Sequence, residues 1–309
     1  MMKVMRLIDA GPPPELAEAT APRPQPQTGE LLVRIRAAGI ISTEPLWSPT
    51  SQTRDGRERK GAVLTHEFSG TIAELGARAT GVSSGDEIYG MNDWYSEGAL
   101  AEYCITRPEW IAPKPKSLTH AEAASVPISA LTAWQGLLVR ARLQAGERLL
   151  IHGAAGAVGI FAVQLARRQG AYIVGTASAA DLPFVTGLGA QQVMDYRAGA
   201  FEEQLRDMDV VFDCVGGETL RRSWGVLKPN GRMVTIAASS EAQTEERVKQ
   251  VFFIVEPDRR QLVEVANLID AGELRTVVGS VIPLAQASKA YSGTLQPKPR
   301  GKVVVQVSA

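Results

Sequence analysis

The period of the hydrophobic positions changes along the chain and predicts two kinds of structure. In the first third, Leu31, Val33 and Ile35 alternate with the positions between them, and Gly and Pro residues separate many short apolar runs. Alternation with period two is typical of a half-buried strand. Short strands between frequent turns predict a β-barrel-like domain. The polar segment 48–60 breaks the pattern and predicts a mobile loop.

From residue 118 onward the period becomes helical and then alternates between helix and strand. Residues 118–142 predict one helix, and Thr119 and Glu122 have the spacing of a capping box. The expected strands that follow are 148–152, 172–176, 192–195, 209–214, 232–237 and 251–255, with helices between them. This alternation predicts a parallel sheet covered on both faces, with ligands at the carboxyl ends of its strands. A strand–helix–strand pattern after Leu274 is interpreted as the chain returning to the first domain.

The most informative stretch is RLLIHGAAGAVGIFAVQLARRQGA, residues 148–171. It combines a strand, a turn of small residues and an amphipathic helix. Ala154, Gly156 and Gly159 have the G-x-G-x-x-G spacing, with Ala in the first place. Such a turn lets the backbone approach a pyrophosphate, with the helix N-terminus facing its charge. An ordinary helix start has the same composition, but the strand–helix units downstream favour nucleotide binding. The expected contacts are Ala155, Gly156, Ala157, Val158 and Gly159.

Composition and charge exclude several classes of protein. Lys plus Arg and Asp plus Glu are 33 each among 309 residues, which argues against binding to nucleic acid or to an anionic membrane. No apolar run reaches the roughly 18 residues of a membrane span, and the first residues lack the apolar core of a leader peptide. With only Cys104 and Cys214, reduced thiols are expected. A cytoplasmic enzyme is the resulting expectation.

Motifs along nearly the whole chain resemble the medium-chain dehydrogenase/reductase superfamily, in its zinc-independent quinone-oxidoreductase-like branch. These motifs are GELLVRIRAAGI, THEFSGTIAELG, GDEIYGM, GALAEY, AASVPISALTAWQGL, HGAAGAVGIFAVQLARRQGA, VVFDCVGGETL, LKPNGRMV and RGKVVVQV. The resemblance implies an α/β fold with a GroES-like β-barrel domain at residues 1–120 and 275–309. It implies a Rossmann domain with a doubly wound parallel sheet at 121–274, and a homodimer formed by sheet edges near 251–255.

The zinc ligands of the related alcohol dehydrogenases are largely missing. Their first cysteine would fall at Ile41 and their third ligand near Pro127, which leaves His66. Because a zinc site needs three or four ligands, no metal is expected. An alcohol dehydrogenase with atypical zinc ligands is the competing hypothesis.

The expected cofactor is NADPH. Sites for NAD usually carry an acidic residue about 20 positions after the glycines, but here the strand ends in Thr176 and Ser178 without one. A carboxylate would repel a 2′-phosphate, so its absence permits NADPH. Asp181 lies nearby in the sequence, and an N-cap role before Pro183 is the interpretation we favour for it. The ends of the later strands should also line the cofactor, at Val215, Ala237 and Phe253. The resemblance adds Thr132, Tyr196 and Arg300, and Lys302 is a further expected contact.

Without a metal, the acceptor must be polarised by hydrogen bonds or accept hydride through its own electronics, as quinones and α,β-unsaturated carbonyls do. Thr43 is a candidate donor, and His66 with Glu67 is a candidate proton relay. The candidates for an aromatic wall around a flat acceptor are Trp47, Trp94 and Tyr95. Each of these residues also has a purely structural interpretation: a turn hydroxyl, inert hydrogen-bonded side chains, or core packing.

The leading hypothesis is therefore an NADPH-dependent quinone or enone reductase that acts without metal on a small-molecule acceptor. The alternative is a non-catalytic NADPH-binding protein, acting as a redox sensor or a structural protein. Both need the same nucleotide pocket, so the sequence leaves the choice open.

Overall fold

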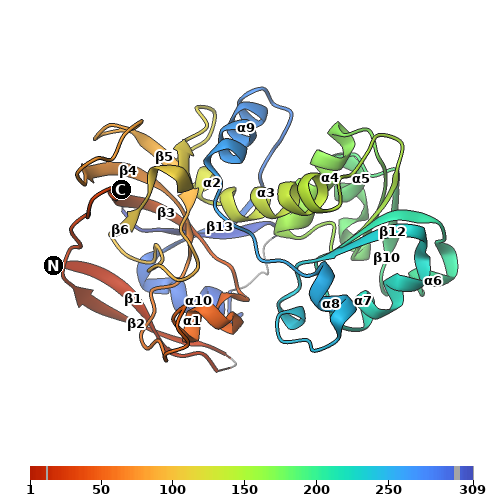
Figure 1. Ribbon diagram of the computed structural model, residues 1–309, viewed down its shortest axis with the longest axis horizontal. Coiled ribbons are helices and arrows are strands. Elements are labelled where there is room, and N and C mark those ends of the chain that lie inside the picture. Colours follow the sequence, from red (N-terminus) through yellow and green to blue (C-terminus); the bar gives the residue numbers. More distant parts are fainter. Residues whose placement is uncertain (12, 296–299, 309) are drawn as a thin grey trace. The chain divides into compact units, whose positions relative to one another are not determined.

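The structure is a computed structural model that describes residues 1–11, 13–295 and 300–308. It divides into two compact units (Figure 1). The first contains residues 1–128 and 256–309, and the second contains residues 129–255. No helix among the described residues is long and apolar enough to cross a membrane.

The first unit is built around a mainly antiparallel sheet that, within the described residues, has seven strands. The path of the sheet is β13 (Val278–Pro283), β14 (Lys302–Gln306), β3 (Leu31–Gly39), β4 (Glu67–Leu75), β5 (Glu87–Met91) and β7 (Ile111–Pro113), and β6 (Tyr103–Thr106) also pairs with β3. A separate hairpin joins β1 (Met2–Asp9) to β2 (Glu15–Ala21). The β-rich domain expected from the first third of the sequence is therefore present.

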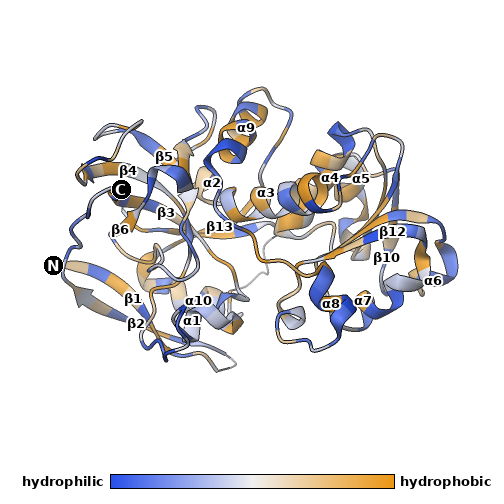
Figure 2. Ribbon diagram, in the orientation of Figure 1, coloured by the Kyte–Doolittle hydropathy of each residue, from blue (hydrophilic) through white to orange (hydrophobic). Residues whose placement is uncertain are grey.

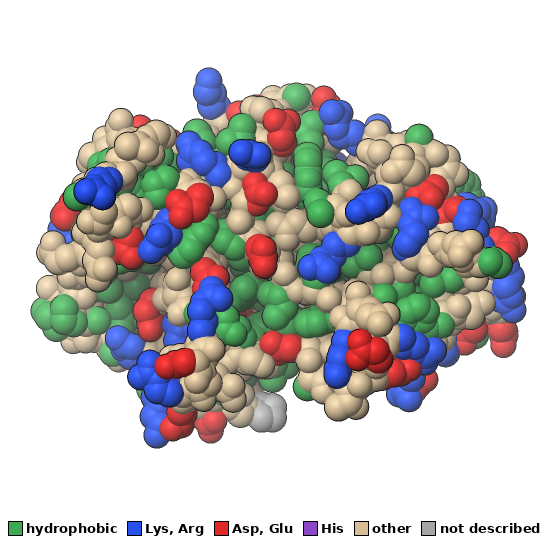
Figure 3. Space-filling view, viewed as in Figure 1, with side chains coloured by type: hydrophobic (Ala, Val, Ile, Leu, Met, Phe, Trp, Pro, Cys, Tyr) green, Lys and Arg blue, Asp and Glu red, His purple; other side chains and the backbone are tan. Residues whose placement is uncertain are grey.

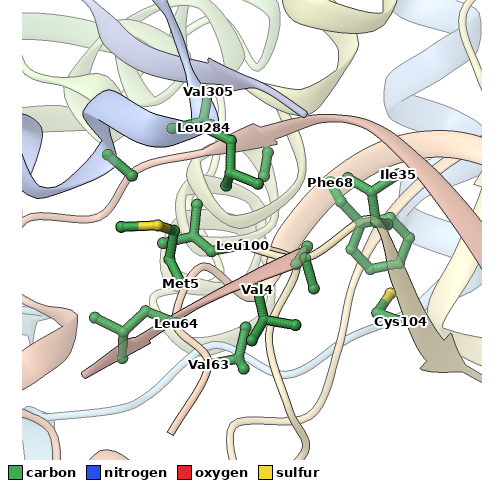
Figure 4. Packing of buried hydrophobic residues seen from close by; sticks show 14 of the residues in the cluster. Val4, Met5, Ile35, Val63, Leu64, Phe68, Leu100, Cys104, Leu284 and Val305 are labelled. Atoms are coloured by element: carbon green, nitrogen blue, oxygen red, sulfur yellow. The ribbon is translucent and has the colours of Figure 1, made fainter. Parts of the chain in front are cut away.

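Strand β3 lies at the centre of this sheet, and it is more buried than its sequence pattern predicted. Leu32, on the opposite face from Leu31 and Val33, is also 0 % exposed. Because β3 pairs with β4, β6 and β14, it is an inner strand of the sheet with both of its edges hydrogen-bonded. The core beside it is apolar, and Figure 4 shows ten labelled members of this cluster: Val4, Met5, Ile35, Val63, Leu64, Phe68, Leu100, Cys104, Leu284 and Val305.

The C-terminal segment returns to the first unit, as expected, but it does so earlier than residue 275. Helix α9 (Arg259–Asp270) belongs to this unit, because its residues are bonded to β5, β7 and the segment after β7. The Tyr89 hydroxyl donates to the Leu262 carbonyl at 2.5 Å, and the Arg259 guanidinium donates to the Ile111 carbonyl at 2.8 Å. The expected boundaries at 120/121 and 274/275 therefore lie at 128/129 and 255/256 in the structure.

The single helix expected at 118–142 is interrupted. Helix α2 (His120–Ala124) begins with the expected capping box of Thr119 and Glu122, which is confirmed. Helix α3 (Pro127–Trp134) then starts at a proline, and residues Gln135–Arg140 form a π-helix. Because proline disfavours helical backbone in the residue before it, α2 cannot run into α3.

The second unit contains a parallel sheet of five strands within the described residues. Their order is β10 (Gln192–Asp195), β9 (Tyr172–Ala177), β8 (Arg148–His152), β11 (Met208–Asp213) and β12 (Leu227–Thr235). Figure 1 shows α4 (Ala157–Arg168) and α5 (Leu182–Leu188) on one side of this sheet. The opposite side carries α6 (Phe201–Gln204), α7 (Gly217–Ser223) and α8 (Glu246–Val251). This is the doubly wound arrangement that the alternating pattern predicted.

The expected strand at 251–255 is wrong for this structure. Helix α8 extends to Val251, and only an isolated parallel bridge joins Phe252 to Thr235 of β12. The Phe252 amide still donates to the Val248 carbonyl at 2.9 Å, so the helical geometry reaches the residue where the strand was expected. The expected loop at 48–60 also contains a short helix, α1 (Ser48–Ser51), and a bridge between Gln52 and Glu58.

Hydropathy and charge follow this architecture. In Figure 2, the inner strands of both units are mostly hydrophobic, and the outer surfaces of the helices are more polar. On the face shown in Figure 3, side chains of Lys and Arg alternate with those of Asp and Glu without a large region of one sign. This distribution agrees with the equal numbers of the two charge types, 33 each.

Candidate functional site

The glycine-rich turn lies at the carboxyl end of β8, where it begins α4. Gly153 has a φ of 74°, and Gly156 is the N-cap residue of the helix. The first α-helical hydrogen bond is donated by the Ile160 amide to the Gly156 carbonyl oxygen at 2.9 Å. The amides of residues 157–159 therefore lie in the first turn, where a helix has no acceptors of its own for its amides. The predicted contact residues 155–159 all lie on this turn.

Close packing explains the small residues of the turn. A Cβ at Gly159 would lie 2.2 Å from the Gly153 carbonyl oxygen, so this position accepts only glycine. The first position of the motif holds Ala154, which is fully buried. Its methyl group faces Gly175 on β9, where an added Cβ would lie 3.0 Å from it. The Ala154 methyl group therefore fits against β9 because Gly175 has no side chain.

The ends of β9 and β10 lie side by side. Asp195 pairs with Ala177, and the Tyr196 amide donates to the Ala177 carbonyl at 3.2 Å. Thr176 is buried, whereas the Tyr196 ring is 54 % exposed. The guanidinium of Arg197 lies 5.0 Å from the centroid of that ring. Sequence reasoning missed Arg197, although its place directly after a strand end was visible.

A carboxylate does lie at this edge, although the strand itself ends without one. Asp181 is the N-cap residue of α5, as expected, but its side chain makes no capping hydrogen bond. Its Oδ2 accepts a hydrogen bond from the Ser178 hydroxyl at 2.6 Å. The NADPH expectation rested partly on the absence of an acidic residue. Strand β9 does end without one, but Asp181 brings a carboxylate to the same edge.

A buried aspartate shapes the loop after β11. Asp213 accepts hydrogen bonds from the amides of Val215 and Gly216 and, at 2.8 Å, from the Thr235 hydroxyl. Burial raises the pKa of Asp213, and these hydrogen bonds oppose that rise by stabilising the carboxylate. Val215, a predicted contact, is 53 % exposed at the tip of the loop. Sequence reasoning missed Asp213, because a buried strand end gives no sign that a carboxylate turns back onto the loop.

The remaining predicted contacts of the second unit are more buried. Ala237 follows the end of β12, and an added Cβ at Gly216 would lie 2.6 Å from the Ala237 Cβ. Phe253 is 4 % exposed, and the guanidinium of Arg140 lies 4.5 Å from its ring centroid. Thr132 is buried on α3. The backbone near Gly216 and Ala237 is thus tightly packed, whereas Val215 is accessible.

In the first unit, His66 and Glu44 form a buried pair. The Nε2 of His66 lies 3.0 Å from the Ser96 carbonyl, which can only accept, so Nε2 carries a proton. The Nδ1 lies 2.6 Å from Glu44 Oε1, which also accepts from the Thr65 amide at 2.7 Å. One further proton is therefore shared between Nδ1 and Oε1, and the pair as a whole is neutral. Thr65, which directly precedes His66 and donates its amide to Glu44, has a φ of 71°, which is rare for a β-branched residue.

Glu67, the second predicted relay residue, pairs with Lys302 instead of with His66. The Lys302 ammonium forms an ion pair with Glu67 Oε1, and the other oxygen accepts from the Ile128 amide at 2.9 Å. Burial raises the pKa of Glu67, and the positive charge of Lys302 opposes this rise. Lys302 was predicted to contact the cofactor, but its side chain is buried in the first unit. Arg300, two residues earlier, is exposed.

The predicted aromatic wall is only partly brought together. Trp94 lies between Trp47 and His66, with ring centroids 6.3 Å and 5.2 Å away, and both tryptophans are buried. Tyr95 is separate from them: it is exposed and has the Arg54 guanidinium 4.5 Å from its ring centroid. Thr43 is exposed, and its hydroxyl does not cap the short helix that it precedes.

The residues present do not fit a zinc ion. Both ring nitrogens of His66 are engaged within the first unit, by Glu44 and by Ser96. Across residues 1–11, 13–295 and 300–308, no group of three or more His, Cys, Asp or Glu side chains is arranged to hold a metal ion. We therefore derive no chemistry through a metal.

Comparisons with known proteins agree with this fold. Residues 27–116 match the model of the alcohol dehydrogenase GroES-like domain, and residues 188–305 match that of the zinc-binding dehydrogenases. The chain is 32 % identical to a "Probable zinc-binding oxidoreductase, mitochondrial" of Arthroderma benhamiae, over 96 % of this chain and 94 % of that protein. It is also 32 % identical to "NAD(P)H oxidoreductase RTN4IP1, mitochondrial" of Danio rerio, over 79 % and 72 % of the two chains.

Among solved structures, the quinone oxidoreductase of Coxiella burnetii is similar over 99 % of both chains. Its TM-score is 0.89 and its sequence identity is 27 %. The similarity therefore extends over both units.

Proposed function

Because the chain belongs to the quinone-oxidoreductase-like branch of the medium-chain dehydrogenase/reductase superfamily, we propose that it transfers hydride from NADPH to a quinone or an α,β-unsaturated carbonyl without a metal ion. The observation that carries the proposal is the turn at residues 153–159, which begins α4 at the carboxyl edge of a parallel sheet. A nicotinamide cofactor supplies the hydride chemistry, and the protein supplies binding and orientation.

The turn would bind the pyrophosphate through the amides of residues 157–159 and the positive end of the helix dipole. This contribution is only about 0.3–1 kcal/mol for an exposed anion, so the remaining strand ends must hold the rest of the cofactor. Val215, at the exposed tip of the loop held by Asp213, is the best-placed of these residues for contact with a ligand. Thr132, Ala237 and Phe253 complete the proposed nucleotide site.

The preference for NADPH would depend on a balance of charges at the ends of β9 and β10. Tyr196 and Arg197 offer a hydroxyl and a guanidinium to a 2′-phosphate. Asp181, bonded to Ser178, opposes a phosphate. Two unit charges 4 Å apart interact by about 4 kcal/mol at an effective dielectric constant of 20, so contributions of opposite sign nearly offset each other. We therefore propose a modest rather than a strict preference.

On the acceptor side, we propose Thr43 as the hydrogen-bond donor, because its hydroxyl is exposed. His66 and Glu67 would act indirectly, since each is already bonded to a residue of its own unit. They would fix the backbone around Thr65 and the tryptophans Trp47 and Trp94. Tyr95, which is accessible, is the proposed aromatic contact for a planar acceptor.

We also propose a cytoplasmic homodimer in which the edges of the parallel sheets meet. Thr235 and Phe252 form only an isolated bridge at that edge. Pairing with a second copy would supply the hydrogen-bond partners that convert residues 251–255 into a full strand. Sedimentation analysis should give twice the mass of the chain, and a monomer at all concentrations would contradict this part of the proposal.

The function is tested with purified protein that has been dialysed against a chelator. The assay follows the loss of NADPH or NADH with a panel of quinones and enones, and then with added zinc. Turnover without metal, faster with NADPH, is the expected result. Tight NADPH binding without turnover would favour the non-catalytic alternative, and activity that appears only with zinc would favour an alcohol dehydrogenase.

A further inference from the structure

A chain of hydrogen bonds crosses the second unit behind the glycine-rich turn. His152, the last residue of β8, has its Nδ1 3.0 Å from the Thr176 hydroxyl and its Nε2 2.9 Å from the Ser223 hydroxyl. The Gly153 amide donates to the Thr176 hydroxyl oxygen at 3.4 Å. At the other end, the Ser223 hydroxyl lies 2.6 Å from the Thr219 carbonyl.

The backbone groups at the two ends fix the direction of the hydrogen bonds at Ser223 and at Gly153. The Thr219 carbonyl can only accept, so the single proton of the Ser223 hydroxyl is used there. His152 must then donate from Nε2 to Ser223. The Gly153 amide can only donate, so the Thr176 hydroxyl oxygen accepts from it. A neutral ring with its proton on Nε2 completes the chain, because its Nδ1 accepts from the Thr176 hydroxyl.

The surroundings of His152 favour this neutral form. The ring is buried and lies 4.5 Å from the Phe201 ring in an edge-on arrangement. Burial, together with the positive charge of Arg222, lowers the pKa of His152 to about 3. A second proton on the ring would face the hydroxyl proton of Thr176 and break the chain.

The two ends of the chain lie on the two loops that we assign to the cofactor. Gly153 begins the turn proposed for the pyrophosphate. Thr219 and Ser223 lie on α7, which directly follows Val215 and Gly216. Strands β8 and β11 pair up to His152 and Asp213, and the Cys214 amide donates to the His152 carbonyl at 3.4 Å. Beyond these strand ends, the side chain of His152 adds a hydrogen-bonded link from Gly153 to α7.

We propose that His152 is a positioning residue of the dinucleotide site, which holds Gly153 and α7 in one fixed arrangement through this one-way chain of hydrogen bonds. The inference rests on the proposed function, because it takes the turn as the seat of the pyrophosphate. His152 itself would touch neither cofactor nor substrate.

The first test reads the tautomer directly by nitrogen-15 NMR of the histidine side chains in the full-length protein. The chain has only 3 histidines, so the signal lost in His152→Phe identifies this residue. We expect a neutral ring protonated at Nε2 that does not titrate between about pH 5 and 8. A ring protonated at Nδ1, or one that titrates in this range, would overturn the proposal.

The second test measures the Kd of two probes by fluorescence titration or calorimetry. NADPH contains the pyrophosphate, whereas 2′-AMP does not. His152→Phe and Thr176→Val each leave a buried hydrogen-bonding group without its partner, so NADPH should bind about tenfold or more weakly. For His152→Phe, the Kd of 2′-AMP should stay within about twofold, because His152 lies on β8 and not at the ends of β9 and β10. Thr176 lies at the end of β9, so the Thr176→Val variant is judged by NADPH alone.

Thr186→Val, the same change at an exposed position of α5, is the matched control and should bind both probes as the wild type does. If His152→Phe does not fold, Thr176→Val carries the test, since it keeps the imidazole. The role of His152 would be overturned if His152→Phe weakened the binding of both probes equally, or if both variants bound NADPH as tightly as the wild type. Either result would leave the proposed function untouched. A wild-type protein that binds neither NADPH nor NADH would overturn the proposed function together with this inference.

Discussion

Lys302 and Glu67 form a buried ion pair between the start of β14 and the start of β4, with the Lys302 side chain 7 % exposed and that of Glu67 0 % exposed. Removing one partner of such a pair leaves a charge without compensation in a place that water does not reach. Lys302→Met should therefore lower the free energy of unfolding by about 3–5 kcal/mol in urea denaturation. The double variant Lys302→Met/Glu67→Gln should recover a large part of the loss. Equal destabilisation by the single and double variants would show that the charge of Glu67 is not the cause.

The depressed pKa of His152 predicts a loss of stability in acid. Its pKa is about 3 in the folded protein against an ordinary value of 6.5 for histidine, so the unfolded chain binds the additional proton. This contribution is fully present above about pH 6.5 and is lost as the pH falls toward about 3, by up to 1.4 kcal/mol per pH unit. Between pH 7 and 5, the wild type should lose about 2 kcal/mol more than His152→Phe does. Urea titrations of the two proteins at both pH values measure the difference, and parallel losses would contradict the assignment.

Gly159 and Gly187 should respond in opposite ways to alanine. The new Cβ at residue 159 would lie 2.2 Å from the Gly153 carbonyl oxygen, whereas one at residue 187 has no heavy atom within 4 Å. Gly159→Ala should displace the turn and weaken NADPH binding severely. Gly187→Ala, in the interior of α5, should raise stability by about 0.5–1 kcal/mol and leave binding unchanged. Thermal melts and NADPH titrations of both variants test this contrast, which fails if Gly159→Ala binds normally.

Asp181 and Arg197 should shift the cofactor preference in opposite directions. Asp181→Asn removes the negative charge bonded to Ser178 and should increase the affinity for NADPH relative to NADH. Arg197→Gln should decrease the same ratio. Each change should be about three- to tenfold and should shrink at high salt, because both charges lie near the surface. NADH, which lacks the 2′-phosphate, is the internal control, and equal effects on both nucleotides would contradict this explanation.

The sequence predicted the elements whose pattern is local. The strand, turn and helix at 148–168 and the capping box of Thr119 and Glu122 depend on neighbouring residues, and they occur in the structure as expected. The tail was also assigned to the first unit, because the strand period returns after Leu274.

Pairings between distant segments were not predictable in this way. Glu67 was grouped with His66 because they are adjacent in the sequence. In the structure Glu67 is the first residue of β4 and His66 precedes that strand, and each side chain has a separate partner. Residues 251–255 are apolar enough for a strand, but whether they form one depends on a partner beyond the sheet edge. Asp181 was correctly placed at the start of α5, yet its contact with Ser178 depends on the fold of the turn between them.

The meeting of Ala154 and Gly175 has a consequence for how dinucleotide turns vary in evolution. The motif normally has glycine in its first position, which leaves space beside the neighbouring strand. Here the first position is Ala154, and the residue without a side chain is Gly175 on that strand. The requirement for a small residue therefore applies to these two positions together. Glycine at position 154 would remove one of the two closest contacts of an alanine at 175, and the other, with Val185 Cγ1 at 3.1 Å, would remain. Alanine at both positions would require the backbone or Val185 to shift. A strict search for the glycine pattern would reject chains that, like this one, have alanine at position 154, although the turn keeps its place between β8 and α4.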